Sequence, residues 1–328
     1  MSVQFKIVTP SENDVRLDRW FKRHFPSVSH GTIEKLLRKK NIRVNKLKAT
    51  ANQRLKAGDE IRIPPFEVET TAPVKIQKKL SPKDIQFIQS LVLYKDSDVI
   101  VINKPAGLAV QGGTKTTRHV DGLLDGLMFD YTERPRLVHR LDKETSGVLM
   151  IARTVQSAAL YTKLFKTKDI QKVYWALVNS CPKPKEGKIE APLLKKTGAL
   201  GEKMFVDFEN GDTAISLYQT IDNLANKVAW LQLSPLTGRT HQLRVHCADV
   251  LKTPIIGDTK YGKRNPLAGQ IPGQMYLHAH SISWTNENGK DKTVTAPAPD
   301  YFKTAFNEFG FDEKQPIEKL LKTKRRKK

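Results

Sequence analysis

Apolar and polar residues alternate in regular patterns at the start of the chain, over residues 16–62. Two apolar stripes at helical spacing predict two helices, namely Leu17, Trp20, Phe21 and Phe25 for the first and Ile33, Leu36 and Leu37 for the second. Ser29 is well placed to cap the second helix. Short strands are predicted around turns by apolar residues that alternate with polar ones, at Ile42, Val44, Ile61 and Ile63.

The stretch from residue 64 to about residue 86 has no sustained period. It is rich in proline, lysine and threonine, a composition that favours an extended linker. The chain is therefore predicted to contain a small domain at 1–65, a linker at 66–88, a large domain at 89–305 and a C-terminal segment with a basic tail at 306–328.

Strand and helix patterns follow one another through the large domain. Strands are predicted at residues 99–102, 171–178 and 228–233, and a helix at residues 155–166. Within the second of these strands, Tyr174 falls on one face while Trp175 and Leu177 fall on the other. Residues 181–213 are rich in proline and glycine and predict loops and short hairpins.

Length and composition indicate a cytoplasmic protein. The 328 residues can form a large and a small domain, each with its own core. No apolar run approaches the ~20 residues that a membrane span needs, and residues 1–14 lack the layout of a signal peptide. Cys181 and Cys247 belong to no CxxC pair, so we expect neither a disulfide framework nor a cysteine zinc site.

The charge is strongly positive and concentrated in the first domain. The whole chain carries a formal charge of +22, which suits a polyanionic partner such as nucleic acid. Residues 16–62 hold 14 Lys and Arg against four Asp and Glu. This surplus favours contacts with phosphates over a merely solvated face.

The most informative stretch is the nine-residue sequence His139-Arg140-Leu141-Asp142-Lys143-Glu144-Thr145-Ser146-Gly147, which precedes an apolar run at residues 148–151. Asp142 lies between cations that favour its charged form. The small residues after it permit a tight bend before a buried strand. A carboxylate in this setting is held in place, either to anchor the turn or to take part in chemistry.

Three further motifs accompany it. Asn103-Lys104-Pro105-Ala106-Gly107 follows the first predicted strand, Lys172-x-Tyr174-x-Ala176-x-Val178 lies in the second, and the stretch 235–246 contains Thr237-Gly238-Arg239-Thr240-His241. Together with the Asp142 sequence, these motifs resemble the RluA-type pseudouridine synthases. The loop 254–262 is also similar to that family, and residues 16–62 resemble an S4 RNA-binding domain, which often comes first in such enzymes.

The resemblance implies a fold and an activity. The expected fold is α+β, with a small S4-like domain followed by a catalytic domain whose mixed, mainly antiparallel sheet holds a central active-site cleft. The expected enzyme is an isomerase that converts uridine to pseudouridine in RNA. This rearrangement consumes no nucleotide or redox equivalent, and no cofactor or metal is expected.

The resemblance also implies roles for individual residues. Asp142 is expected to be the catalytic residue, with Arg239 pairing with its carboxylate and Tyr174 stacking on the uracil. Arg140 is expected to fill the space that the extruded uridine leaves, and His139 to contact RNA or to hold the loop. Other RNA contacts are expected on the basic face of the S4-like domain, at Lys35, Arg38, Lys39 and Arg43.

The expected partner is RNA, most of all ribosomal RNA of the large subunit (23S) or its assembly intermediates, bound by a monomer that touches no membrane. Transfer RNA is an alternative substrate. Two other classes explain part of the sequence: a non-catalytic RNA-binding or ribosome-assembly protein, and a metal-dependent RNA-modifying enzyme that would use His241, His246, His278 and His280. The histidine spacings match no zinc motif, so hydrogen bonding or RNA contact is the favoured reading of them.

Overall fold

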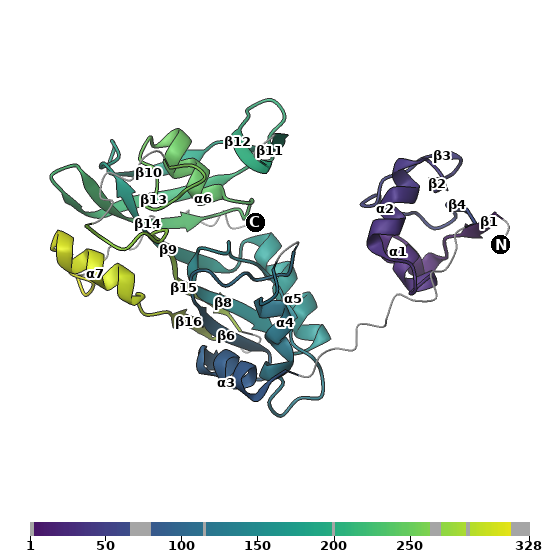
Figure 1. The fold of residues 1–328 in the computed structure, drawn as a ribbon, viewed down its shortest axis with the longest axis horizontal. Coiled ribbons are helices and arrows are strands. Elements are labelled where there is room, and N and C mark those ends of the chain that lie inside the picture. The colour runs from purple at the N-terminus through teal and green to yellow at the C-terminus, as the bar shows by residue number, and fades with distance from the viewer. Residues whose placement is uncertain are drawn as a thin grey trace. The chain divides into compact units, whose positions relative to one another are not determined.

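A computed structural model of the chain describes residues 3–65, 80–113, 116–198, 201–262, 270–286 and 289–315. The chain divides into two compact units, Met1–Lys79 and Leu80–Lys328, each of which can be followed by its labels in Figure 1. Most of the predicted linker, residues 66–79, and the basic end of the tail lie outside the described residues. No helix among the described ranges is both long enough and apolar enough to cross a membrane.

The first unit packs two helices against a small sheet. The helices are α1 Leu17–His24 and α2 His30–Arg38, preceded by the 3-10 turn η1 Pro10–Glu12. The strands are β1 Gln4–Ile7, β2 Arg43–Val44, β3 Leu47–Lys48 and β4 Glu60–Ile63, in the spatial order β1-β4-β2-β3. The two predicted helices are therefore confirmed, and the apolar residues of their stripes, with Ile42, Val44, Ile61 and Ile63 from the strands, form the core.

Capping explains where α2 begins. The Ser29 side chain accepts a hydrogen bond from the Thr32 backbone amide at 3.1 Å, which satisfies one of the free amides of the first turn and is worth about 1 kcal/mol. The predicted cap is thus confirmed.

The second unit is built on a ten-stranded sheet. Its main path has the order β10-β13-β14-β9-β15-β8-β6-β5, with β16 paired to β15 and β7 to β8, while β11 and β12 form a separate hairpin. The strands are β5 Val92–Lys95, β6 Val99–Lys104, β7 Arg136–Leu137, β8 Ser146–Ala152, β9 Gln171–Asn179, β10 Glu186–Glu190, β11 Leu193–Gly198, β12 Gly201–Val206, β13 Ile215–Leu224, β14 Val228–Pro235, β15 Leu277–Thr285 and β16 Asp291–Thr295.

Helices pack on this sheet. They are α3 Pro82–Ser90, α4 Val120–Leu123 with the 3-10 turn η2 Leu124–Leu127, α5 Val155–Thr167, α6 Gln242–Val245 with the π-helical turn η3 His246–Val250, and α7 Asp300–Phe309. Among the described residues, β8 with β15 is the one parallel pair of the large sheet. The predicted α+β class with a mixed, mainly antiparallel sheet is confirmed.

The centre of the sheet depends on a close approach between β8 and β15. Gly147 has φ +107°, and a Cβ built on it would lie 2.1 Å from the backbone oxygen of Ala279. Only glycine fits at this point. The glycine that ends the Asp142 motif therefore allows β15 to lie beside β8, directly behind the loop that carries Asp142.

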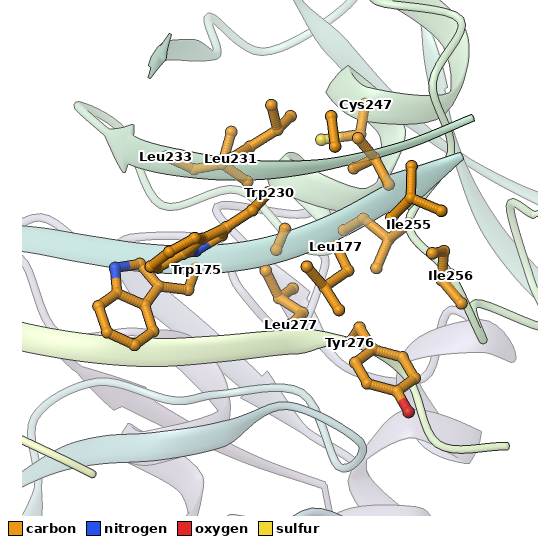
Figure 2. Close-up of a cluster of buried hydrophobic side chains, with 14 of the residues drawn as sticks. Trp175, Leu177, Trp230, Leu231, Leu233, Cys247, Ile255, Ile256, Tyr276 and Leu277 are labelled. Atoms are coloured by element: carbon orange, nitrogen blue, oxygen red, sulfur yellow. The ribbon is translucent and has the colours of Figure 1, made fainter. Parts of the chain in front are cut away.

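The larger core of this unit is rich in aromatic side chains, as Figure 2 shows for residues of β9, β14 and β15. The Trp175 and Trp230 rings meet edge to face at 5.0 Å, and Phe302 and Phe306 of α7 pack against the same cluster. Trp175 and Leu177 face this core, as the alternation along β9 predicts. Tyr174 lies on the opposite face of the strand, where it is partly buried and packs against both large hydrophobic clusters of this unit.

Two predicted boundaries are wrong. The linker was predicted to extend to residue 88, but α3 begins at Pro82 and buries Ile88 in the core of the second unit. The large domain was predicted to end at residue 305, but α7 continues to Phe309 and buries Phe306. Both helices have short apolar stripes that are buried by elements far away in the sequence, which the local pattern does not reveal.

Candidate active site

A pocket of about 550 Å³ opens in the second unit at the ends of the central strands. Its lining comes from the loop before β8, from the end of α5 and the start of β9, and from the stretch that joins β14 to α6. Asp142, Tyr174 and Arg239 all line it. The pocket therefore brings these three side chains together.

Asp142 is held by Arg244. The Nη1 atom of Arg244 donates to Asp142 Oδ2 at 3.1 Å, while its Nε and Nη2 atoms donate to the two oxygens of Asp258, each at 2.7 Å. The guanidinium thus makes a bidentate pair with Asp258 and has one edge left for Asp142. Asp258 also accepts from the backbone amides of Lys260 and Tyr261.

Burial strengthens the attraction between the charges of Arg244 and Asp258. The Asp258 side chain is fully buried and that of Arg244 is only 9% exposed. Burial by itself raises the pKa of Asp258, but the hydrogen bonds and charge of Arg244 outweigh it, so the net pKa is lowered. In the same way burial lowers the pKa of Arg244, and the two carboxylates raise it above its ordinary value. The pair stays charged and orients the Asp142 carboxylate.

Arg239 does not pair with Asp142. Its Nη1 atom lies 3.3 Å from Asp212 Oδ2, and its Nε atom donates to the Thr213 carbonyl at 3.0 Å. The predicted pairing of Arg239 with Asp142 is therefore wrong. The partner is Arg244, five positions later in the same motif. The reason is local geometry, because Arg239 precedes α6 and reaches outward, whereas Arg244 lies within α6 and faces the interior.

Tyr174 reaches the pocket through strand register. It pairs with Ala279 on β15, and Ala279 pairs with Gly147 on β8, so Tyr174 lies two strands across from the end of the Asp142 loop. Burial and the Asp142 charge raise the pKa of its hydroxyl above the ordinary tyrosine value. The phenol therefore keeps its proton at neutral pH.

His241 approaches Asp142 from another direction. Its Nε2 atom lies 3.9 Å from Asp142 Oδ2, and its Nδ1 atom lies 2.7 Å from the Tyr261 hydroxyl, which accepts from the Met204 amide. With the hydroxyl donating to Nδ1, a neutral ring carries its hydrogen on Nε2, which faces the carboxylate. His241 has φ +52°, a left-handed conformation that a histidine adopts only where surrounding contacts hold it.

The loop that carries Asp142 is anchored from beneath by Lys104. Its buried ammonium donates to the carbonyls of Pro105, Leu108 and Lys143, at 2.8–3.0 Å. Burial lowers the pKa of Lys104 to about 7. The Asn-Lys-Pro-x-Gly motif thus ties the end of β6 to the residue that follows Asp142.

His139 and Arg140, the predicted RNA-contacting residues beside Asp142, differ in surroundings. His139 accepts the Met150 amide on Nε2 at 2.8 Å and stacks on Phe165 with ring centroids 4.4 Å apart. Burial and the charge of Lys172 lower its pKa to about 3, so the ring is neutral and holds the loop. Arg140 is exposed and lines the pocket.

Of the other candidate histidines, His246 and His278 form side-chain hydrogen bonds, whereas the His280 ring stacks on Trp175 with ring centroids 3.6 Å apart and its buried Nδ1 atom has no hydrogen-bond partner among the described residues. His246 contacts Ser216 Oγ and the Ala191 carbonyl, and His278 contacts Ser146 Oγ. No group of three or more His, Cys, Asp and Glu side chains in the described ranges is arranged to hold a metal ion. For His246 and His278 these contacts agree with the structural hydrogen bonding that the sequence analysis favours.

In the first unit, Lys35, Arg38, Lys39 and Arg43 are all exposed. Arg38 also lines a shallow groove with Arg16 and Lys48. The arrangement leaves these ammonium and guanidinium groups accessible to a polyanion.

Comparison with known proteins places the chain in a family. The model of the family described as RNA pseudouridylate synthase matches residues 98–249, and the S4 domain model matches residues 15–61. Ribosomal large subunit pseudouridine synthase C of Rickettsia conorii is 38% identical, over 88% of this chain and 95% of that protein. The chain belongs to the RNA pseudouridylate synthase family. The predicted S4 domain and the predicted enzyme class, an RNA pseudouridine synthase, are thereby confirmed.

Two further members of the pseudouridylate synthase family are similar to this chain. Ribosomal large subunit pseudouridine synthase C of Escherichia coli K12 is 31% identical over 92% of this chain and 95% of that protein. The solved structure of Human RNA Pseudouridylate Synthase Domain Containing 4 superposes on this chain with a TM-score of 0.59 and 27% sequence identity. The superposition covers 70% of this chain and 97% of the human chain.

Sequence reasoning missed Arg244 as the partner of Asp142. A usable signal was present, because Arg244 is flanked by the apolar residues Leu243 and Val245 and followed closely by Cys247 and Ala248, a setting typical of a buried segment. An arginine in such a position is buried, and a buried arginine needs a carboxylate. The loop 254–262, predicted to support the site, supplies that carboxylate as Asp258.

Proposed function

We propose that this pseudouridine synthase modifies uridines in large-subunit ribosomal RNA and that Asp142 starts the reaction. The observation that carries the proposal is the Asp142 carboxylate, held at 3.1 Å by Arg244 in a pocket that also contains Tyr174. The names of the relatives in Rickettsia conorii and Escherichia coli support the ribosomal substrate.

The chemistry requires one bond to break and another to form. The bond from C1′ of the ribose to N1 of uracil breaks, the base turns, and C1′ joins C5. The C5 proton is then lost and N1 gains one, so atoms and electrons balance without an external reactant. Asp142 can act as a nucleophile at C1′ or at the base, and Arg244 keeps it aligned for either route.

Tyr174 has two tasks in this proposal. Its ring provides a flat surface on which the extruded uracil stacks, and its hydroxyl assists removal of the C5 proton in the last step. A uridine in folded RNA must leave its stack, which costs about a few kcal/mol. Arg140, exposed beside the pocket, is suited to fill the vacated space.

The S4 domain adds affinity that does not depend on the chemistry. Lys35, Arg38, Lys39 and Arg43 are exposed, and each phosphate contact they make displaces a counterion. Deleting residues 1–65 should therefore weaken RNA binding and its salt dependence more than the chemical step. The enzyme is expected to act in the cytoplasm as a monomer. Sedimentation of the purified protein can test the monomeric state.

The central experiment compares Asp142→Asn with the wild-type enzyme on uracil-5-tritiated large-subunit ribosomal RNA and on transfer RNA. The wild type should release tritium from the ribosomal RNA. The variant should release none while it binds the same RNA with unchanged affinity and unfolds at the same temperature. Turnover by the variant would remove Asp142 from its role, and release from transfer RNA alone would overturn the ribosomal assignment.

A further inference from the structure

One wall of the active-site pocket carries a group of lysines that the proposed chemistry leaves unused. Lys166 and Lys168 come from the end of α5 and its cap, and Lys172 from the start of β9; together they are called the lysine wall. No side-chain hydrogen bond or ion pair joins any of the three ammonium groups to the described residues. Each of them nevertheless lines the same pocket as Asp142.

The other cations of the pocket differ in this respect. Arg244 is balanced by Asp142 and Asp258, and Arg239 by Asp212. The positive charge that the protein does not neutralise is therefore concentrated on the lysine wall, with exposed Arg140 nearby.

Lys172 is the member of the lysine wall that most clearly indicates a negatively charged ligand. It is only partly exposed, two residues before Tyr174 on the same face of β9, and its charge acts on His139. Burial lowers its pKa to about 8. The described residues provide no carboxylate for it, and a desolvated ammonium without a partner destabilises the folded protein. Such a group is best explained by a ligand that brings its own negative charge.

We infer that the lysine wall is a phosphate-binding subsite, which holds the backbone phosphates on either side of the target uridine, with Lys172 on the phosphate nearest the base. This inference rests on the proposed function. An extruded nucleotide carries its flanking phosphates to the pocket together with the base. Uracil itself is neutral and cannot balance the ammonium, whereas a phosphate can.

The test uses the full-length enzyme and a ribosomal RNA fragment in which it forms pseudouridine. The fragment is prepared with normal linkages and with a single neutral methylphosphonate 5′ or 3′ of the target uridine. Variants are Lys172→Met, which keeps the apolar stem, and Lys163→Met as the matched control. Lys163 is an exposed lysine of α5 that does not line the pocket.

For one of the two methylphosphonate positions, the wild type and Lys163→Met should both bind the neutral fragment about tenfold more weakly than the normal fragment. A tenfold loss is what removal of a hydrogen bond to a charged group is expected to cause. Lys172→Met should bind the normal fragment about tenfold more weakly and lose little more when that linkage is neutral. This non-additivity is the signature of a direct contact. Independent, additive losses at both linkages would overturn the inference.

A stability measurement separates this role from a structural one. Because Lys172 has no protein partner, Lys172→Met should leave the melting temperature of the free enzyme unchanged or raise it while RNA binding falls. A lower melting temperature with unchanged RNA affinity would overturn the inference but leave the proposed function intact. Failure of the wild type to form pseudouridine in any ribosomal RNA would overturn both.

Discussion

The carboxylate of Asp142 and the guanidinium of Arg244 meet at 3.1 Å although 102 positions separate them in the sequence. Arg244 is fixed first by its bidentate pair with Asp258, and it presents its remaining edge to Asp142. A carboxylate that is aligned by a buried arginine, itself held by a second carboxylate, loses little further freedom when substrate binds. Such preorganisation is what a nucleophile requires.

Replacing Arg244 with Gln should abolish tritium release and also destabilise the fold. The change leaves the Asp258 carboxylate buried without its cation, which costs about 3–5 kcal/mol in comparable pairs. Urea unfolding followed by circular dichroism measures the loss of stability. An unchanged unfolding free energy would contradict the geometry described for this pair.

Arg239→Gln is the matched comparison within the same motif. The side chains of Arg239 and Asp212 are 41% and 73% exposed, so the change should alter the unfolding free energy by less than about 1 kcal/mol. Asp142 keeps its arginine partner, and the single-turnover rate on saturating RNA should stay close to that of the wild type. A loss of rate as large as that of Arg244→Gln would restore the assignment made from sequence.

Arg239 and Arg244 show which features of the site could be predicted from the sequence and which could not. The motifs predicted the family, the α+β class and a cleft shared by Asp142, Tyr174 and Arg239, because these follow from local patterns and from resemblance. Which arginine contacts the carboxylate depends on where each lies relative to the short helix α6, since Arg239 precedes the helix and Arg244 lies within it. That contact is set by packing against the Asp258 loop, which no local pattern encodes.

The domain boundaries show the same limit. The helix α3 has a weak apolar stripe of which only Ile88 is fully buried, and α7 is stabilised by aromatic contacts with Trp175 and Trp230 across the sheet. Their partners lie far away in sequence. The strands of the sheet centre, in contrast, were predictable because continuous apolar runs such as residues 148–151 are typical of strands buried on both faces.

Gly147→Ala should be severely destabilising. A Cβ at this position would lie 2.1 Å from the Ala279 carbonyl oxygen, so β8 and β15 would have to separate. Gly310→Ala is the control, because Gly310 also has a positive φ but has open space around it, and it should cost only about 1 kcal/mol. Chemical denaturation of both variants gives the comparison, and equal losses would argue against the close approach of the strands.

Acid should destabilise the enzyme through its buried histidines. In the folded state the pKa of His139 is lowered from 6.5 to about 3, so the unfolded chain binds the extra proton first. Its contribution to stability is complete above pH 6.5 and is lost as the pH falls toward 3, by up to about 1.4 kcal/mol per pH unit. His139→Gln retains an acceptor for the Met150 amide, so it should lose less stability than the wild type between pH 8 and pH 5 in urea titrations.

Tyr174 offers a way to separate stacking from proton removal. Tyr174→Phe keeps a flat ring against the base but lacks the hydroxyl, whereas Tyr174→Leu lacks both. Stacking of a base on an aromatic ring is worth about 1–3 kcal/mol, so the Leu variant should bind RNA about tenfold more weakly or worse, while the Phe variant binds normally and releases C5 tritium slowly. The wild-type hydroxyl stays protonated because its pKa is raised by burial and by Asp142, so it must work with a base when it assists. Release of C5 tritium by the Phe variant at the wild-type rate would show that the hydroxyl has no part in the last step.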